Sequence, residues 1–233
     1  MNNSYLPRLV SLSAAGVLSF SAAFAEEPKT PAPPPAEAAA AAGVVKLDFE
    51  SMEPGDLPAE LVVTDAEAKF SIAVVENNKV LEMSPTPLVD GGVLLGTSIK
   101  GPATVSARVL ATGKRRSHPR FGVGLHGAGG YRCLIAPARK EIQFMKDDAV
   151  VAQTPFEWKS GIWTRIEFTL TKNAAGGSDL EARAWQEPTA RPAAPQLTLT
   201  VPTPPGTGKA SLWATPYSES PVDFDDVEVA PKP

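Results

Sequence analysis

Apolar and polar residues alternate along much of the chain in short stretches, and the spacing typical of helices is scarce. In residues 163–172, Ile166, Phe168 and Leu170 share one side of an extended backbone, while mostly charged or hydroxyl-bearing side chains take the other side. Residues 180–187 alternate in the same way. This period of two predicts strands that are buried on one face and solvated on the other.

Similar stretches follow one another from residue 44 to residue 229, separated by turn-forming residues. They span 44–50, 69–76, 79–84, 92–99, 103–111, 120–127, 131–137, 141–147, 149–155, 163–172, 180–187, 197–201, 209–216 and 222–229. Asn77-Asn78 and Lys146-Asp147-Asp148 are signals for tight turns, because Asn and Asp tolerate a positive φ. Many short strands with turns between them predict an all-β fold, a two-sheet antiparallel β-sandwich.

The first 25 residues have the features of an export signal. Arg8 precedes an apolar run from Leu9 to Phe20, and Ala23-Phe24-Ala25 is a small-x-small pattern of the kind that signal peptidase cleaves. A membrane anchor is the alternative, but the run is shorter than the roughly 20 apolar residues that cross a bilayer. We therefore predict a signal peptide over residues 1–25 and a periplasmic or secreted mature protein.

Residues 26–43 are rich in proline and alanine and do not alternate, so they are predicted to be a linker. Residues 44–233 are then expected to form one β-sandwich domain. This domain contains the only cysteine of the chain, Cys133, which cannot form an internal disulfide. Its stability must therefore come from a hydrophobic core, and Cys133 itself is expected to be a small buried side chain.

Charge and composition exclude several classes of function. The formal net charge is −4 and no sustained basic run is present, so nucleic acid is not an expected partner. The chain has only two histidines, His118 and His126, and neither an H-E-x-x-H nor a C-x-x-C pattern, so a zinc site is not expected. Beyond the signal, no segment is long and apolar enough to span a membrane.

The order of several motifs resembles a known fold family. These motifs are Gly130-Tyr131, the hairpin EIQFMKDD at 141–148, Phe156-x-Trp158-x-x-Gly161-x-Trp163, Gly208-x-Ala-x-Leu212, Phe224-Asp225-Asp226 and an opening DFE at 48–50. Together they resemble the concanavalin A-like lectin and glucanase sandwich, in particular its laminin-G-like bacterial members. The resemblance covers most of residues 44–230 and implies a jelly roll whose ligands bind on the concave sheet or on the rim loops.

The resemblance also implies a possible cofactor, because members of this family often hold calcium between the first and last strands. Here Glu50, Asp225 and Asp226 are the expected carboxylate ligands. The alternative is that Asp225 and Asp226 only protect a sheet edge from aggregation.

No catalytic motif accompanies the resemblance. The glucanase members carry catalytic carboxylates as E-x-D-x-E on one strand, and this chain lacks that pattern. Glu167 with Glu181 or Glu187 could supply a carboxyl pair across a hairpin at glycosidase spacing. The competing interpretation is that these carboxylates form cross-strand ion pairs with Arg165 and Arg183.

A saccharide platform is the main candidate binding site. It contains two tryptophans on positions predicted to face outward, with a nearby tyrosine and two arginines: Trp185, Trp213, Tyr217, Arg183 and Arg165. Aromatic rings with polar tips suit binding surfaces, and sugar rings present flat faces to them. Alternatively, the tryptophans pack against the proline-rich residues 188–205.

Three functions are compatible with these features. The leading hypothesis is an exported, noncatalytic β-sandwich that binds glycans or another extracellular polymer. A glycan-active hydrolase or lyase that uses Glu167, Glu181 or His126 is the second, because the fold hosts both binders and enzymes. A structural envelope or adhesion domain without a sugar ligand is the third.

Overall fold

The computed structural model describes residues 43–232. The predicted signal peptide and residues 26–42 of the predicted linker lie outside the described residues. The described chain contains strands and connecting loops only, so it has no helix that could cross a membrane. The strands are β1 (Val45–Leu47), β2 (Val62–Val63), β3 (Phe70–Val75), β4 (Asn78–Met83), β5 (Gly91–Lys100), β6 (Ala103–Ala111), β7 (Arg120–Leu125), β8 (Tyr131–Ala136), β9 (Glu141–Lys146), β10 (Ala149–Pro155), β11 (Thr164–Lys172), β12 (Ser178–Gln186), β13 (Leu197–Val201), β14 (Thr207–Thr215) and β15 (Val222–Pro231).

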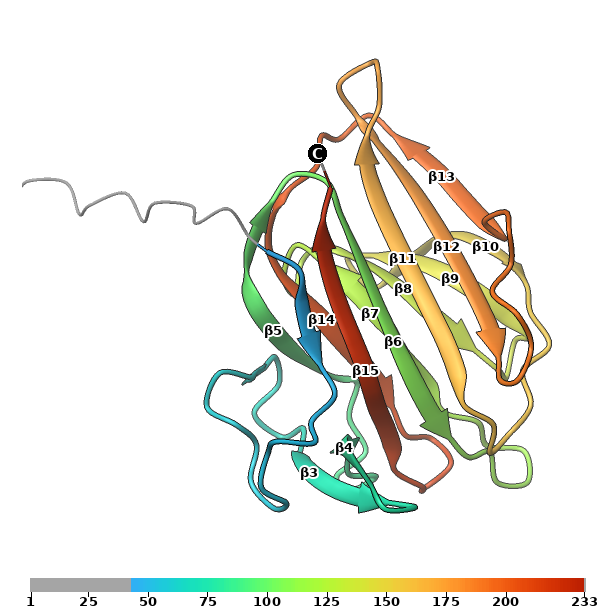
Figure 1. Ribbon diagram of the computed structural model, residues 1–233. Helices are drawn as coiled ribbons and strands as arrows, with labels where there is room; N and C mark the ends of the chain where they lie inside the picture. Colours follow the sequence, from blue (N-terminus) through green and yellow to red (C-terminus); the bar gives the residue numbers. More distant parts are fainter. Residues whose placement is uncertain (1–42, 233) are drawn as a thin grey trace, which may run out of the picture. The chain divides into compact units, whose positions relative to one another are not determined.

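These strands form two antiparallel sheets that pack face to face (Figure 1). The eight-stranded sheet has the order β13-β12-β11-β6-β15-β4-β3, and β1 pairs with β15 beside this path. The seven-stranded sheet has the order β10-β9-β8-β7-β14-β5-β2. Neighbours in each sheet are often far apart in sequence, as in a jelly roll. The predicted two-sheet sandwich is confirmed.

Each stretch predicted to be a strand overlaps an observed strand, and three strands, β6, β10 and β13, have the predicted bounds. The strand β2 was missed, because two residues are too few to reveal an alternating period. Both tight turns are present. Asp147 and Asp148 have φ values of 47° and 62°. At the first turn the positive φ values fall on Glu76 and Asn77, one residue earlier than predicted, and Asn78 already belongs to β4.

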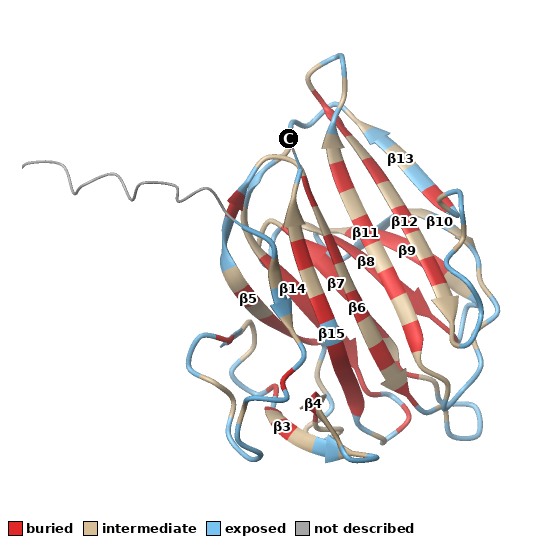
Figure 2. Cartoon of the chain, in the orientation of Figure 1, coloured by how far each residue is buried: buried red, intermediate tan, exposed pale blue. Residues whose placement is uncertain are grey.

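The core lies between the sheets and is built by the alternation seen in the sequence. Figure 2 shows buried and partly exposed residues alternating along β6, β11 and β12. Ile166, Phe168 and Leu170 are buried as predicted. Cys133 is fully buried in the same core, and this burial raises the pKa of its thiol, which keeps the thiol protonated.

Three pairs of strands determine which side chains lie next to one another on the outer face of the eight-stranded sheet. The predicted hairpin of β11 and β12 is present and places Arg165 opposite Trp185, and Glu167 opposite Arg183. On its other side, β11 pairs with β6, which brings Ser106 opposite Glu167. Ser106 in turn lies opposite Glu228 of β15. A row of polar side chains therefore runs across four strands on the outer face.

Candidate functional site

The five residues of the predicted saccharide platform do not form one surface. Arg165, Arg183 and Trp185 lie on the outer face of the eight-stranded sheet. Trp213 belongs to β14 of the opposite sheet, and Tyr217 is exposed in the turn after β14. The prediction of a single platform is therefore wrong. Alternation along a strand tells which side chains point outward, but it does not tell which of the two sheets contains the strand.

Trp213 points away from the core, as predicted, but it is only 6% exposed. Its partners on both neighbouring strands are glycines, Gly92 on β5 and Gly122 on β7. A Cβ atom on Gly92 would lie 2.7 Å from the Trp213 ring, so the ring occupies the space that this glycine leaves free. Because the ring is covered, it cannot stack on a sugar in this arrangement.

Arg132 of β8 covers the Trp213 ring, with its guanidinium carbon 4.4 Å from the ring centre. The indole N–H of Trp213 donates to the hydroxyl of Ser211 over 2.8 Å. Arg132 also pairs with the carboxylate of Asp148, and Asp90 lies 3.6 Å from its other terminal nitrogen. Trp213 is thus enclosed on the outer face of the seven-stranded sheet by polar groups and by the buried side chains of Leu134 and Met145. The sequence contains a signal for this packing of Trp213. The alternating glycines of RFGVGL, residues 120–125, leave room for a large side chain on the adjacent strand.

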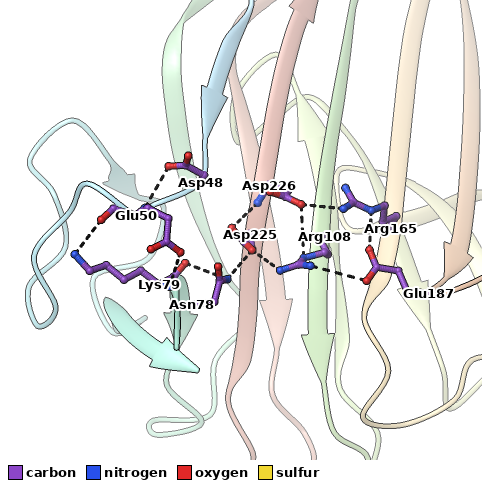
Figure 3. Close-up of polar contacts among 9 residues, drawn as sticks. All are labelled: Asp48, Glu50, Asn78, Lys79, Arg108, Arg165, Glu187, Asp225 and Asp226. Carbon is purple, nitrogen blue, oxygen red and sulfur yellow. Dashed lines mark hydrogen bonds and ion pairs between the residues drawn. The ribbon is translucent and has the colours of Figure 1, made fainter. Parts of the chain in front are cut away.

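The outer face of the eight-stranded sheet carries an ion network that crosses three strands (Figure 3). The Arg108 guanidinium lies 2.6 Å from the Asp225 carboxylate, and Arg165 bonds to Asp226 over 2.8 Å. Arg165 also donates to Glu187 over 2.9 Å. Desolvation of Arg165 acts to lower its pKa, but the bonds and charges of Asp226 and Glu187 outweigh it, so the pKa is raised. The guanidinium of Arg165 therefore stays charged near neutral pH.

Two further contacts fix Arg108 and Asp225 in this network. The guanidinium carbon of Arg108 lies 4.1 Å from the centre of the Trp163 ring, a cation–π contact. The side chain of Asn78 donates to Asp225 over 2.7 Å. Both oxygens of Asp225 are used, because its other oxygen accepts the backbone N–H of Asp226.

The predicted calcium ligands do not fit a calcium site as they stand. Guanidinium groups already occupy the carboxylates of Asp225 and Asp226. Glu50 is separate from them and accepts the backbone N–H of Lys79 (Figure 3). In residues 43–232 no group of three or more acidic, histidine or cysteine side chains could hold a metal ion. Calcium binding by these three residues remains a prediction without the required donor geometry.

Glu167 is held by two arginines and does not resemble a catalytic acid. Arg191, from the loop between β12 and β13, bonds to both carboxylate oxygens over 2.5 and 2.8 Å, and Arg183 approaches over 3.2 Å. Burial alone would raise the pKa of Glu167, but these arginines outweigh it and lower the pKa. Arg183 also contacts Glu181 over 3.4 Å. The interpretation of these carboxylates as partners in ion pairs is confirmed.

The remaining catalytic candidate, His126, has a structural contact. One of its ring nitrogens lies 2.8 Å from the carbonyl oxygen of Gly101, and burial lowers the pKa of the imidazole. A neutral ring can donate its N–H to this carbonyl. The backbone N–H of the next residue, Gly127, donates to the carbonyl of Lys209. His126 thus links the loop after β7 to the turn between β5 and β6, and Gly127 links the same loop to β14.

A concave feature lies over β6, on the outer face of the eight-stranded sheet. Two neighbouring hollows of about 310 and 320 Å³ share Ser106 and Glu228 in their lining. We call them together the β6 groove. The first hollow is lined by Lys46, Leu47, Asp48, Ser106, Arg165, Asp226, Val227 and Glu228, and the second by Thr104, Ser106, Glu167, Thr169, Arg191, Glu228, Ala230 and Lys232.

The floor of the groove consists of short side chains on β6. Ser106 stands between Glu167 and Glu228 in the cross-strand register. In the next row, Thr104 lies between Thr169 and Ala230. The hydroxyls of Thr104 and Thr169 bond to each other over 2.9 Å. Small residues on β6 therefore form a floor, and charged side chains on the flanking strands form the walls.

Three groove residues were already candidates from the sequence: Arg165 and Glu167 on β11, and Asp226, which was expected to bind calcium. The sequence did not reveal the floor of the groove or Glu228. No short motif marks Ser106 or Thr104, and their position depends on the pairing of β6 with both β11 and β15. Arg191 was also missed, because it lies in a proline-rich loop whose path the alternation does not predict.

Comparisons with known proteins place the fold. No protein-family model matches the sequence, and no curated protein matches it. Solved structures do match. "Cellulose induced protein, Cip1" superimposes with a TM-score of 0.53 at 16% identity over 80% of this chain and 96% of its own. A carbohydrate-binding module, CBM66 from Bacillus subtilis, gives 0.51 at 10% identity over 73% and 95%. Lectin II from Ulex europaeus gives 0.50 at 8% identity over 80% and 97%.

At these identities the similarity establishes the fold and leaves the ligand open. The alignment covers almost the full length of each of the three solved structures, so the similarity extends over a whole domain. Together with the two antiparallel sheets, it shows that this chain has a concanavalin A-like jelly-roll fold.

Proposed function

We propose that this protein is an exported, noncatalytic domain that binds a glycan in the β6 groove. The observation that carries the proposal is the groove itself, two adjoining hollows with hydroxyls on the floor and charged side chains along the walls. Glycan hydroxyls both donate and accept hydrogen bonds, and carboxylates and guanidinium groups on the walls offer the matching acceptors and donors. The presence of lectin and carbohydrate-binding modules among proteins of this fold is consistent with this role.

We propose a noncatalytic role because three carboxylates of the groove are already paired with cations. Glu167, Asp226 and Glu228 are each within 3.0 Å of a cationic nitrogen. A glycosidase acid needs a raised pKa so that it holds a proton near neutral pH. The pKa of Glu167 is lowered instead. The geometry therefore favours a binding role over hydrolysis.

Export is proposed from the sequence of residues 1–25. Mass spectrometry of the mature protein from the producing cells should find a chain that begins at Glu26. A mature chain that still contains residues 9–20 would contradict a cleaved signal.

Filling the floor of the groove is the test of the binding proposal. We expect Ser106→Trp to weaken polysaccharide binding by roughly tenfold or more, because the indole occupies the volume where the two hollows meet. Binding is measured by affinity electrophoresis against a polysaccharide panel and then by calorimetry with the best ligand.

The matched control is Thr198→Trp, an exposed position on β13 at the edge of the same sheet. We expect this variant to bind as the unchanged protein does. Equal binding by both variants and the unchanged protein would reject the groove as the site. No binding by the unchanged protein to any glycan of the panel would reject the proposed function.

A further inference from the structure

The β6 groove has no excess of positive or negative side chains, and this balance affects whether it can select a charged glycan. Its lining contains an equal number of cationic and anionic side chains. The cations are Lys46, Arg165, Arg191 and Lys232, and the anions are Asp48, Glu167, Asp226 and Glu228. A groove that selects a polyanion by charge needs an excess of cations. This groove has none.

Three of the four cations are already paired with a carboxylate of the groove. Lys46 lies 3.0 Å from Glu228, Arg165 lies 2.8 Å from Asp226, and Arg191 contacts Glu167 through two bonds. The remaining cation and the remaining anion lie in different hollows, Lys232 in the second and Asp48 in the first. Neither hollow therefore offers a cluster of unpaired cations.

These pairs discriminate between two kinds of ligand. A polyanionic chain would have to compete with Glu228, Asp226 and Glu167 for their cations, and those carboxylates would repel it. An uncharged chain meets no such cost, because its hydroxyls can donate to carboxylate oxygens and accept from guanidinium N–H groups that the pairs leave free. Ser106 lines both hollows, so its hydroxyl can also meet a ligand in the groove.

We infer that the β6 groove takes uncharged glycan chains and excludes polyanionic ones. This inference rests on the proposed glycan-binding function and specifies its ligand class. Most charged side chains of the walls are paired with one another, and the charged side chains together give the groove no net charge. Binding of the uncharged chain therefore depends on hydrogen bonds and on shape complementarity. Its affinity is therefore only weakly sensitive to salt.

The experiment compares two sets of probes on the full mature chain. The uncharged set is mixed-linkage glucan, xylan and galactomannan, and the polyanionic set is alginate and polygalacturonate. We expect binding to at least one uncharged polymer, with an affinity that changes less than about twofold between low and physiological salt. We expect no binding to either polyanion at low salt.

A pair of charge variants makes the test sharper. Glu228→Gln removes one carboxylate from the groove and frees Lys46, so the groove acquires an excess positive charge. We expect this variant to gain measurable, salt-sensitive affinity for alginate. Glu219→Gln is the control, since it makes the same change of charge in the exposed turn before β15 and outside the groove. We expect it to gain none.

The outcomes separate the inference from the proposed function. Salt-sensitive binding of the unchanged protein to polyanions alone would overturn the inference and leave glycan binding intact. Equal gains of alginate affinity in both variants would also overturn it, because the effect would then reflect net charge and not the groove. Failure of every polymer to bind would reject the proposed function, and the inference with it.

Discussion

Replacement of Asp225 with alanine is expected to lower the free energy of unfolding by about 3–5 kcal/mol, the usual result of removing one partner from a buried ion pair. Asp225 is 2% exposed and accepts hydrogen bonds from Arg108 and Asn78 of the neighbouring strands. Its loss leaves Arg108 with only distant carboxylates, Asp226 at 3.7 Å and Glu187 at 3.9 Å. Chemical denaturation at neutral pH measures the change.

The adjacent residue provides the control for this prediction. Asp226 belongs to the same network, but its side chain is 42% exposed. Ion pairs of exposed groups contribute about 1 kcal/mol or less, so Asp226→Ala should have a small effect. Similar losses in both variants would mean that burial of Asp225 does not decide the energy of the network.

The second large effect concerns the pH dependence of stability, through Asp223 on β15. Asp223 is 6% exposed, lies directly opposite Glu82 of β4, and has one buried oxygen without a hydrogen-bond partner among the described residues. Burial, together with the charge of Glu82, raises the pKa of Asp223 from 3.8 to about 7. Like charges that face each other across a strand pair are destabilising. The folded protein therefore holds a proton on this carboxyl at mildly acidic pH.

The direction of the effect follows from proton linkage. Between pH 3.8 and about 7 the folded state binds a proton on Asp223 that the unfolded state releases. The contribution of this group to stability is therefore complete at low pH and is lost as the pH rises through the pKa of the folded state. At about 1.4 kcal/mol for each pKa unit, the loss reaches at most about 4 kcal/mol.

Asp223→Asn removes the titrating group and should remove this loss. Compared with the unchanged protein, the variant should gain stability progressively as the pH is raised from about 4 to about 8, by as much as about 4 kcal/mol. Denaturation curves at several pH values measure the difference. Glu82→Gln is the companion variant, and it should remove only the part of the effect that comes from the opposing charge. Parallel pH profiles for Asp223→Asn and the unchanged protein would contradict the account.

The fold could be predicted from the sequence because alternation is a local signal. In β6 and β11 every second residue is buried, so the sequence itself identified the strands and their inner faces. The hairpin of β11 and β12 could also be predicted, because the two strands are adjacent in sequence. Their register places Glu167 opposite Arg183. The strand β2 has two residues and carries no such signal.

The site was less predictable because it depends on pairing between distant strands. Asp225 and Asp226 were expected to be calcium ligands because of the family resemblance, but their partners Arg108 and Arg165 come from β6 and β11. The register that joins these strands includes a shift between Asp225 and Glu228, which alternation cannot foresee. For the same reason, the sequence placed Trp213 outward but could not assign it to the opposite sheet.

The most direct test of the central claim is the position of a bound ligand. A crystal structure of the protein with the uncharged oligosaccharide that binds best should place the sugar over β6, between the Glu228 wall and the Glu167 wall, in contact with Ser106. A sugar bound on the outer face of the seven-stranded sheet, against Arg132 and Trp213, would contradict the claim that the β6 groove is the binding site.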